Sequence, residues 1–421
     1  MSTAVLEIND RALTLLTGSG ELLVEPGFAH LGTEGISTGN AALARYWLDP
    51  QAAENQFWQK LDTHPLSHRK RWVRHNADLA FMQLQSLWQQ AGASSLIVLV
   101  PDAMADDQLQ LLLGMIEALN SANVIAVASS SLLASAEHHG HQMLFADLHL
   151  HRATLCTLAP EATHTAVQDS QTLPGLGLLA LYRVVARHCA DLLIDQFRYD
   201  PLHTAQGEQQ LYDLIPQWVD QLQHSEALTL DLLTSRGNYQ LVLERAALGT
   251  LLQPLMRPLL EPLQQQVDSE QTVLCTSAAL LPWLAMAAPA LAKRVQVAAD
   301  ATSTALAMRE QLIALSQPLV RIKALPLDPA RASKSKAPRR ATHLLVSGQA
   351  APLQRPIHLN LSDGVTISSP SSAQLTLTPS GAALTISHNS GHANVTLPEQ
   401  WIPGSSLLVD GIALPLIEVL D

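Results

Sequence analysis

Apolar residues along the first 325 positions recur with two periods, which predict alternating strands and helices. The predicted strands include the hairpin Ala4–Ile8 and Ala12–Leu16, the buried run Leu96–Val100 and the run Val124–Val127. The predicted helices are Asn40–Leu48, Pro50–Leu61, Ala77–Ala91, Asp106–Leu119, Gly175–Leu193, Glu208–Gln223, Arg245–Gln265, Leu280–Ala287 and Ala301–Leu315. Strand hairpins interleaved with helices, twice over, predict an α/β protein with two lobes.

The pattern changes near residue 326. A segment rich in Pro, Ala and Ser follows, and its basic residues are Arg331, Lys334, Lys336, Arg339 and Arg340. We interpret residues 326–341 as a solvated linker, with a docking site for an acidic partner as the alternative. Short alternating runs over 342–421, cut by Pro-Ser-Gly and Pro-Gly turns, predict a small β-sandwich. The larger domain is expected at 1–325, with lobe I at about 1–172 plus 300–325 and lobe II at about 173–299.

Composition excludes several classes of function. The chain has 25 Lys and Arg against 37 Asp and Glu, a net charge of −12, which disfavours nucleic acid as a partner. Its apolar runs are shorter than the roughly 20 residues of a membrane span, and its first residues lack the basic and apolar segments of a secretory signal. Three distant cysteines predict buried free thiols in a reducing compartment. We therefore expect a cytoplasmic protein.

The order of elements resembles a known family. Leu96–Pro101, a helix and then Val124–Val127 resemble the strand–Pro–helix–strand pass of DnaK-type chaperones, the heat shock protein 70 family. Leu144–Asp147 before a strand resembles the family's second phosphate loop, and Phe197–Asp200 with Leu243–Ala246 resembles the outer part of its second lobe. The resemblance covers three quarters of the chain by element order. It implies a two-lobed actin-like ATPase fold that binds ATP with Mg²⁺ between the lobes.

The loops that should contact the nucleotide have lost their glycines. Such loops need glycine so that backbone N–H groups can approach phosphate oxygens. In the first loop the acid persists as Glu7, but Asn9 takes the place of glycine and Asp10 adds repulsive charge. In the second, Asp147 is followed by His149 and Leu150 instead of a glycine run. The resemblance implies a vestigial nucleotide cleft at Glu7, Asn9, Asp147, His149, Thr276 and Ser277.

Joint loss of these glycines predicts a non-enzymatic member of the superfamily. No acid near Val127–Ser130 matches the family's catalytic glutamate, so no catalytic residue is assigned. We expect a scaffold or chaperone-like factor that contacts other proteins, with weak or no ATP hydrolysis and no resident cofactor. The alternative is a working ATPase that binds ATP or ADP, in which Glu7 and Asp147 organise Mg²⁺ through water. The oligomeric state is not predicted.

A histidine cluster gives a third hypothesis. His138, His139 and His141 precede His149 and His151, and imidazoles two residues apart on a strand share a face, as a metal site requires. A polar turn and a solvated strand face explain the same residues without a metal. We assign no metal ligand, and the metal site stays open as the less favoured alternative.

The last segment has its own resemblance. Gly364–Ile367, Ala373–Leu377, Ala383–Ser387 and the ending from Pro403 to Val419 follow the strand rhythm of a forkhead-associated domain. Such domains place an arginine after an early strand, but here Ser368 and Ser369 follow Ile367. Since phosphothreonine recognition relies on charge-assisted contacts, this departure argues against that activity.

Overall fold

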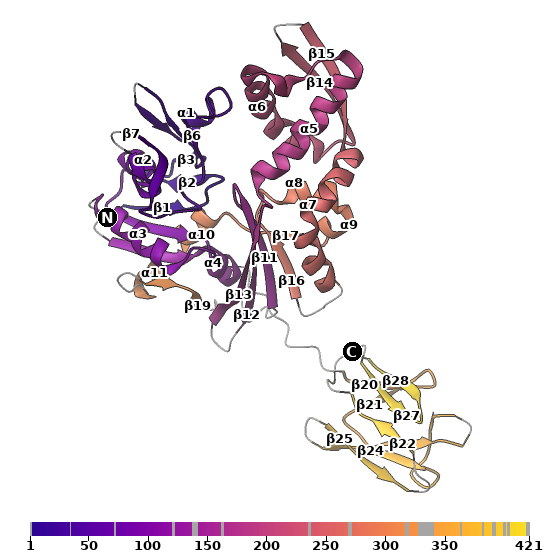
Figure 1. Cartoon of the computed structure of the whole chain (residues 1–421). Helices are drawn as coiled ribbons and strands as arrows, with labels where there is room; N and C mark the ends of the chain where they lie inside the picture. The colour runs from indigo at the N-terminus through magenta and orange to yellow at the C-terminus, as the bar shows by residue number, and fades with distance from the viewer. Residues whose placement is uncertain are drawn as a thin grey trace. The chain divides into compact units, whose positions relative to one another are not determined.

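The computed structural model (Figure 1) describes residues 2–33, 35–70, 73–119, 123–136, 142–160, 164–234, 237–267, 272–315, 320–326, 341–362, 364–380, 383–389, 393–398, 401 and 405–417. The chain divides into two compact units, residues 1–332 and 333–421. The first is a mixed α/β unit built on two six-stranded sheets. Among the described residues, no helix combines the length and apolar character that crossing a membrane requires.

The first sheet has the order β18-β10-β9-β1-β2-β3. Its strands are β1 (Thr3–Glu7), β2 (Leu13–Leu16), β3 (Leu22–Glu25), β9 (Ser95–Val100), β10 (Asn123–Ala128) and β18 (Arg321–Ile322). Strands β1, β9, β10 and β18 run parallel, whereas β1–β2 and β2–β3 are antiparallel hairpins. The hairpin predicted around Asn9 and Asp10 is confirmed, with Val5 opposite Leu16.

The second sheet has the order β17-β16-β11-β12-β13-β19. Its strands are β11 (Gln142–Leu148), β12 (Arg152–Pro160), β13 (His164–Pro174), β16 (Thr272–Thr276), β17 (Gln296–Val297) and β19 (Ala324–Pro326). Strands β11, β16 and β17 are parallel, and β11–β12–β13 form an antiparallel meander. The second sheet thus begins at Gln142, which differs from the lobe boundary expected near residue 172.

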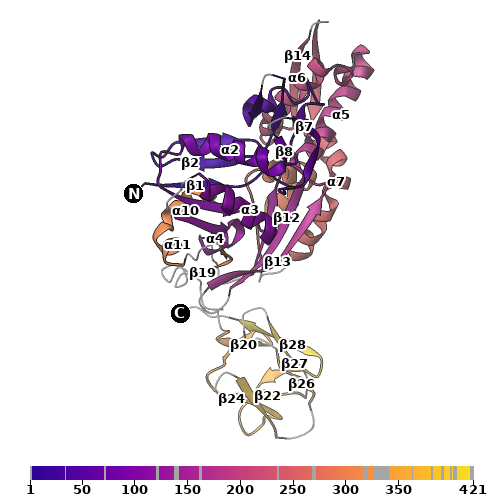
Figure 2. The same ribbon diagram turned by 60° about the vertical axis from the view of Figure 1, so that its left-hand side comes forward.

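The two sheets share one strand order. When the strands of each sheet are counted along the chain, both contain the run third-second-first-fourth-fifth, as β3-β2-β1-β9-β10 and as β13-β12-β11-β16-β17. The turn after β1 therefore corresponds to the turn after β11. We call residues 2–136 with 301–322 the first half of the unit, and residues 142–297 with 324–326 the second half (Figures 1 and 2).

Three apolar cores hold these layers together. Helices α2 (Asn76–Gln90) and α3 (Asp106–Glu117) bury one face of the first sheet, with Leu84 and Leu112 at most 1% exposed. Helices α5 (Leu178–Phe197), α6 (Ala205–Leu222) and α7 (Arg245–Gln266) form the core of the second half. A third core joins the facing sides of the sheets, where Val5 and Ile97 belong to the same buried cluster as Phe145 and Cys275.

Several predicted helices are confirmed, and others are wrong. Helices α2, α3, α5, α6, α7 and α8 (Leu281–Ala287) form within a few residues of their expected bounds. Helix α1 stops at Asn40–Leu43, and the helix expected over Pro50–Leu61 is replaced by turns around β6 (Ala53–Glu54). The helix expected over Ala301–Leu315 is split into α10 (Ala301–Ala307) and α11 (Arg309–Leu315), since Met308 between them has non-helical angles.

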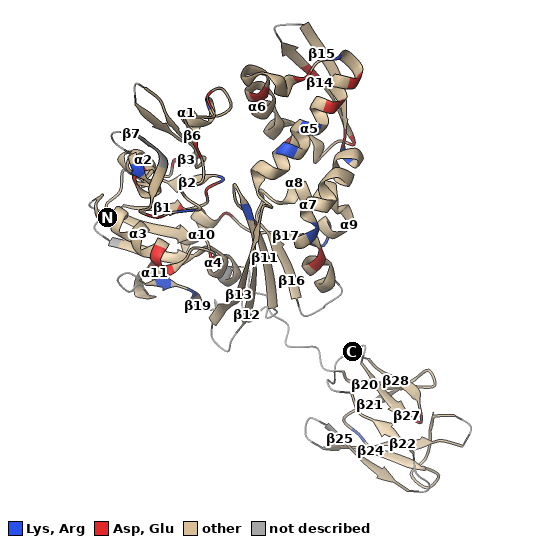
Figure 3. Cartoon of the chain, in the orientation of Figure 1, with Lys and Arg blue, Asp and Glu red and all other residues tan. Residues whose placement is uncertain are grey.

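Smaller elements complete the first unit. Strand β4 (Ala29–Leu31) pairs with both β5 (Ile36–Thr38) and β6, and β7 (Pro65–Lys70) pairs with β8 (Val73–His75). Helix α4 (Ser129–Ala136) follows β10, a 3-10 turn (Pro201–His203) precedes α6, and α9 (Pro289–Ala292) follows α8. The predicted hairpin of the second half is confirmed as β14 (Ala227–Thr234) and β15 (Gly237–Glu244). Along α5 the basic residues Arg183 and Arg187 precede the acidic residues Asp191 and Asp195, and Arg187 lies 3.4 Å from Asp191 (Figure 3).

All described elements of the second unit are strands. One sheet has the order β21-β20-β28-β27-β26 and the other β23-β22-β24-β25. Both contribute to one apolar core, in which Leu344, Leu359 and Leu407 are fully buried. The strands are β20 (His343–Val346), β21 (Gln349–Pro352), β22 (Ile357–Asn360), β23 (Thr366–Ile367), β24 (Leu375–Ser380), β25 (Ala383–His388), β26 (Val395–Thr396), β27 (Ser406–Val409) and β28 (Ile412–Ile417). The linker expected over 326–341 lies almost wholly outside the described residues.

Candidate functional site

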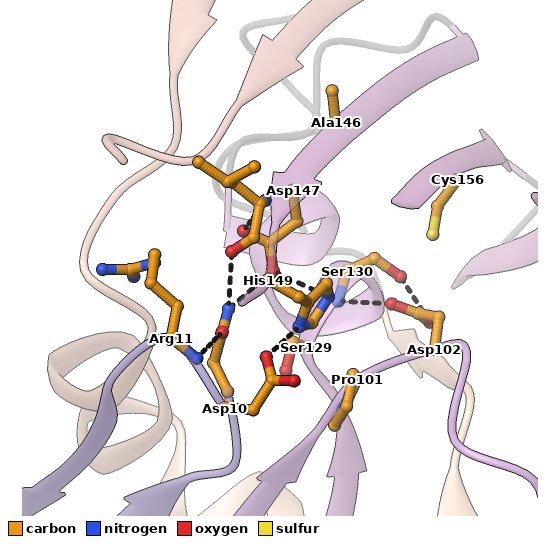
Figure 4. A network of polar contacts seen from close by, with 12 residues as sticks. Asp10, Arg11, Pro101, Asp102, Ser129, Ser130, Ala146, Asp147, His149 and Cys156 are labelled. Carbon is orange, nitrogen blue, oxygen red and sulfur yellow. Dashed lines mark hydrogen bonds and ion pairs between the residues drawn. The ribbon is translucent and has the colours of Figure 1, made fainter. Parts of the chain in front are cut away.

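The turn after β1 meets the turn after β11 where the carboxyl ends of the two sheets approach each other (Figure 4). Asn9 of the first turn is only 3% exposed. Its side-chain Nδ2 lies 3.2 Å from both Asp147 Oδ2 and the Leu148 carbonyl oxygen and donates to both. Its Oδ1 accepts from the Arg11 backbone N–H at 3.1 Å. The side chain that replaces the expected glycine therefore joins the two turns.

Asp10 makes the second bond between the turns. Its carboxylate is buried, and Oδ1 accepts a hydrogen bond from the backbone N–H of Leu150 at 2.8 Å. Backbone N–H groups of such a turn are the donors that a phosphate-binding loop offers to its anion. Here the Leu150 N–H donates its hydrogen bond to a carboxylate of the protein itself. Asp10, expected only to repel phosphate, thus accepts a hydrogen bond from the second turn itself.

His149 fills the space between these acids. The imidazole is 2% exposed, with Nδ1 3.7 Å from Asp10 Oδ1 and Nε2 3.6 Å from Asp147 Oδ2 (Figure 4). Both separations exceed hydrogen-bond length, and Nε2 has no hydrogen-bond partner among the described residues. The ring is thus buried between carboxylates from both halves. Its side chain occupies volume that glycine would leave open.

Glu7 lies at the end of β1, beside this cluster. Burial, together with the nearby Asp147 and Asp300 carboxylates, raises the pKa of its carboxyl from 4.5 to about 7, whereas Arg11 opposes the shift. A buried carboxyl with acidic neighbours holds its proton more tightly because ionisation would place a charge in a poorly solvated site. The structure therefore places Glu7, Asn9, Asp147 and His149 close together.

Thr276 and Ser277 lie one strand away, at the end of β16. Thr276 is fully buried, and its hydroxyl donates to the Ala146 carbonyl oxygen at 3.1 Å. The Ser277 backbone N–H also donates to Ala146, at 3.0 Å. Both residues continue the pairing of β16 with β11. They complete the edge of the sheet, next to the contact between the turns.

A second polar pair was missed by sequence reasoning. Asp102, two residues after β9, accepts from the Ser130 hydroxyl at 2.7 Å and from the Ser130 backbone N–H at 3.3 Å. Burial raises the pKa of Asp102 although Ser130 and Arg321 favour its ionised form. Asp102 thus places an acid at the start of α4, whereas the sequence around Val127–Ser130 contains no acid. The available signal was its position directly after a buried strand, since the carboxyl ends of parallel strands meet at one edge.

Neither Cys156 nor Ser129 is placed as an activated nucleophile. Cys156 lies near Asp102, but burial, together with that carboxylate, raises the pKa of its thiol, which opposes formation of a thiolate. The Ser129 hydroxyl donates to the Val100 carbonyl oxygen at 3.2 Å. These groups join the strand ends to α4, as Figure 4 shows for Ser130 and Asp102.

The described residues also contain no group of three or more His, Cys, Asp or Glu side chains placed to hold a metal ion. His138, His139 and His141 lie outside the described residues. His149 and His151 do not share a strand face, because both lie in the turn between β11 and β12. His151 Nε2 lies 3.0 Å from the carbonyl oxygen of Asn55, in the first half. The two imidazoles thus have separate protein neighbours.

ATP with Mg²⁺, the ligand that the family resemblance implies, does not fit the turns as they stand. The Leu150 N–H is bonded to Asp10, and the His149 ring lies between the two acids. Arg152, at the start of β12, is also largely buried, and this burial lowers the pKa of its guanidinium although Asp10 opposes the shift. The site as built is a closed polar contact between two halves.

Comparison with known proteins adds no family assignment. No family model matches the chain, and no curated protein matches it at a significant level.

Proposed function

We propose that the first unit is a two-lobed, actin-like domain of DnaK type that acts as a protein-interaction scaffold or chaperone-like factor, with weak or no ATP hydrolysis. One observation carries this proposal: the Asp10 carboxylate is bonded to the Leu150 backbone N–H. A loop whose donors bind an internal carboxylate has no free donor at that position for phosphate.

The duplicated strand order supports the actin-like part of the proposal. Two sheets with the same order place equivalent turns at facing carboxyl ends, and open α/β sheets bind ligands at such ends. In this proposal the halves are the two lobes, and the second unit is a small β-sandwich that supplies another protein contact. Resemblance of fold does not transfer activity, so the pseudo-ATPase assignment rests on the turns.

The competing function is a working ATPase with divergent loops. Glu7 and Asp147 lie close enough for their charges to interact, as a pair that organises Mg²⁺ through water would. That function requires Asp10 and His149 to leave their present positions, since both are buried between the turns. The geometry favours the scaffold for this reason.

A thermal-shift titration with Mg-ATP and Mg-ADP, supported by calorimetry, separates the two functions. A ligand that binds only the folded state stabilises it by about 2.7 kcal/mol at a hundredfold excess over its dissociation constant. The scaffold predicts no shift at millimolar nucleotide, in the wild type or in the Glu7→Ala, Asp147→Ala double variant. A wild-type shift that disappears in the double variant would establish the ATPase instead.

A variant with smaller side chains tests whether the turns are the cause. Replacing Asp10 and His149 with glycine frees the Leu150 N–H and empties the space between the acids. If these side chains exclude nucleotide, the double-glycine variant should gain a shift with Mg-ATP that the wild type lacks. A matched variant, Asp169→Gly on the exposed part of β13, should gain none.

A further inference from the structure

A second contact between the halves lies away from the turns. Trp47 follows α1, a first-half element, yet its ring belongs to the apolar core of the second half. It stacks on Tyr212 of α6, with ring centroids 4.1 Å apart and planes 13° from parallel. The indigo segment around α1 lies beside α6 in Figures 1 and 2. Trp47 is 9% exposed, so nearly its whole surface is covered.

Gln209 fastens the same contact through the backbone. Its Oε1 accepts from the Trp47 backbone N–H at 3.0 Å, and its Nε2 donates to the Leu43 carbonyl oxygen at 3.1 Å and to Asp213 Oδ1 at 2.8 Å. The amide is 5% exposed, and both of its ends are bonded. A buried amide with satisfied donors and acceptors fixes one geometry, since any displacement leaves polar atoms without partners.

Two further rings hold Trp47 in place from the first half. Tyr46 lies edge-on to Trp47 at 5.0 Å, and Phe28 lies edge-on to Tyr46 at 4.8 Å. Phe28 also belongs to a small buried cluster with Leu150, whose backbone N–H donates a hydrogen bond to Asp10. The aromatic contact and the turn contact are therefore connected through packed side chains.

We propose that Trp47, Tyr212 and Gln209 form an aromatic clasp that holds the two halves at a fixed separation. The halves share one core between their sheets, and the turn contact alone would leave rotation about that region possible. The aromatic contact restrains this rotation, together with the contact of His151 with Asn55, so the halves separate at α6 only when Trp47 leaves Tyr212. The clasp does not depend on the proposed function, because the same contact joins the halves whether or not nucleotide binds at the turns.

Distance measurements between spin labels test the clasp in the full chain. Gln51→Cys and Thr229→Cys place labels on exposed positions of the two halves, and the native cysteines are buried. Trp47→Ala should lengthen and broaden the distance distribution, and hydrogen exchange over 148–152 should rise by about tenfold or more. Trp47→Phe, which keeps a ring against Tyr212, should restore most of the wild-type distribution.

The control separates clasp release from general loss of stability. Trp218→Ala removes a buried indole from α6, the helix of Tyr212, and from the core of the second half. It should lower the melting temperature but leave the label distances unchanged. A wild-type distribution in folded Trp47→Ala, or equal broadening in Trp218→Ala, would overturn the proposal. If Trp47→Ala does not fold, Gln209→Ala provides the test, and an unchanged distribution in that variant has the same meaning.

Discussion

At the scale of single residues, Asp10 stands out because it places a charge where the family resemblance implies a ligand. Its contact with Leu150 spans 140 positions of sequence and joins two turns that correspond in the duplicated strand order. Asp10 was identifiable from the sequence only as an acid beside an eroded loop. Its acceptor role could not be predicted, because the Leu150 N–H comes from a distant strand end.

Removing the Asp10 carboxylate should destabilise the fold. Asp10→Ala leaves the Leu150 N–H buried without an acceptor, which costs about 1–3 kcal/mol of unfolding free energy. Asp10→Asn keeps an oxygen acceptor and should cost less. Urea denaturation at neutral pH measures both, with exposed Asp169→Ala as the control. Equal stability of Asp10→Ala and the control would show that the bond contributes nothing.

Glu7 makes stability depend on pH. Its pKa is about 7 in the folded protein against 4.5 in the unfolded chain, so the stability it contributes is complete below pH 4.5 and lost as the pH rises through 7. The loss above pH 7 is on the order of 3 kcal/mol. Glu7→Gln, which stays neutral, should be more stable than wild type at pH 8 and show a flatter profile.

The matched control for this profile is Glu117→Gln on the exposed side of α3. Chemical denaturation from pH 4 to 8 gives the comparison. Some dependence should persist in Glu7→Gln, because burial raises the pKa of Asp102 in the same direction. Profiles of equal slope for wild type and Glu7→Gln would contradict the assignment of this dependence to Glu7.

At the scale of elements, the same substitution should have opposite effects in two helices. A Cβ atom on Gly249 of α7 would lie 2.2 Å from the Met286 carbonyl oxygen of α8, whereas one on Gly114 of α3 would meet nothing within 4 Å. Gly249→Ala should therefore destabilise by about 1–3 kcal/mol through overpacking. Gly114→Ala should stabilise by about 0.5–1 kcal/mol because alanine loses less entropy in a helix.

Thermal and urea unfolding of the two variants measure these effects. Their comparison is internally controlled, since both replace glycine with alanine inside a helix. If Gly249→Ala is as stable as Gly114→Ala, α7 and α8 do not pack as closely as described.

Periodicity predicted the long elements well and the short ones poorly. The pattern of α7 gives a helix within one residue of the observed end. Phe57, Trp58 and Leu61 mimic helical spacing, but turns bring them into the first core, where each is at most 4% exposed. The Trp58 indole N–H donates to Gln83 Oε1 of α2 at 2.8 Å. Tertiary contacts of this kind replace a helix that local spacing favours, and no local pattern reveals them.

The candidate site was predicted to a similar extent. The positions of Glu7, Asn9, Asp147 and His149 follow from strand ends, because strands end near turns that the sequence marks. Which side chains bond across the turns does not follow, since it depends on how two sheets approach. The clasp at Trp47 was missed for the same reason: its partner Tyr212 is on a helix of the other half.

At the scale of the whole molecule, the two units should fold independently. Each has its own buried core, and the second contains Leu344, Leu359 and Leu407 from both of its sheets. Separately produced 1–332 and 333–421 should each unfold cooperatively. The heat of unfolding that calorimetry measures for the full chain should then equal the sum of the heats for the two fragments. A second fragment without a cooperative transition would contradict this expectation.

The three cysteines make opening of the first unit measurable by thiol modification. All three are buried: Cys156 and Cys275 lie in the core between the two sheets, and Cys189 lies in the core of the second half. A thiol reagent can modify them only when the surrounding core opens, so modification rates report opening of two separate regions. The second unit contains no cysteine. Thiol modification therefore does not detect opening of the second unit. In the intact chain, every modified thiol reports that part of the first unit has opened.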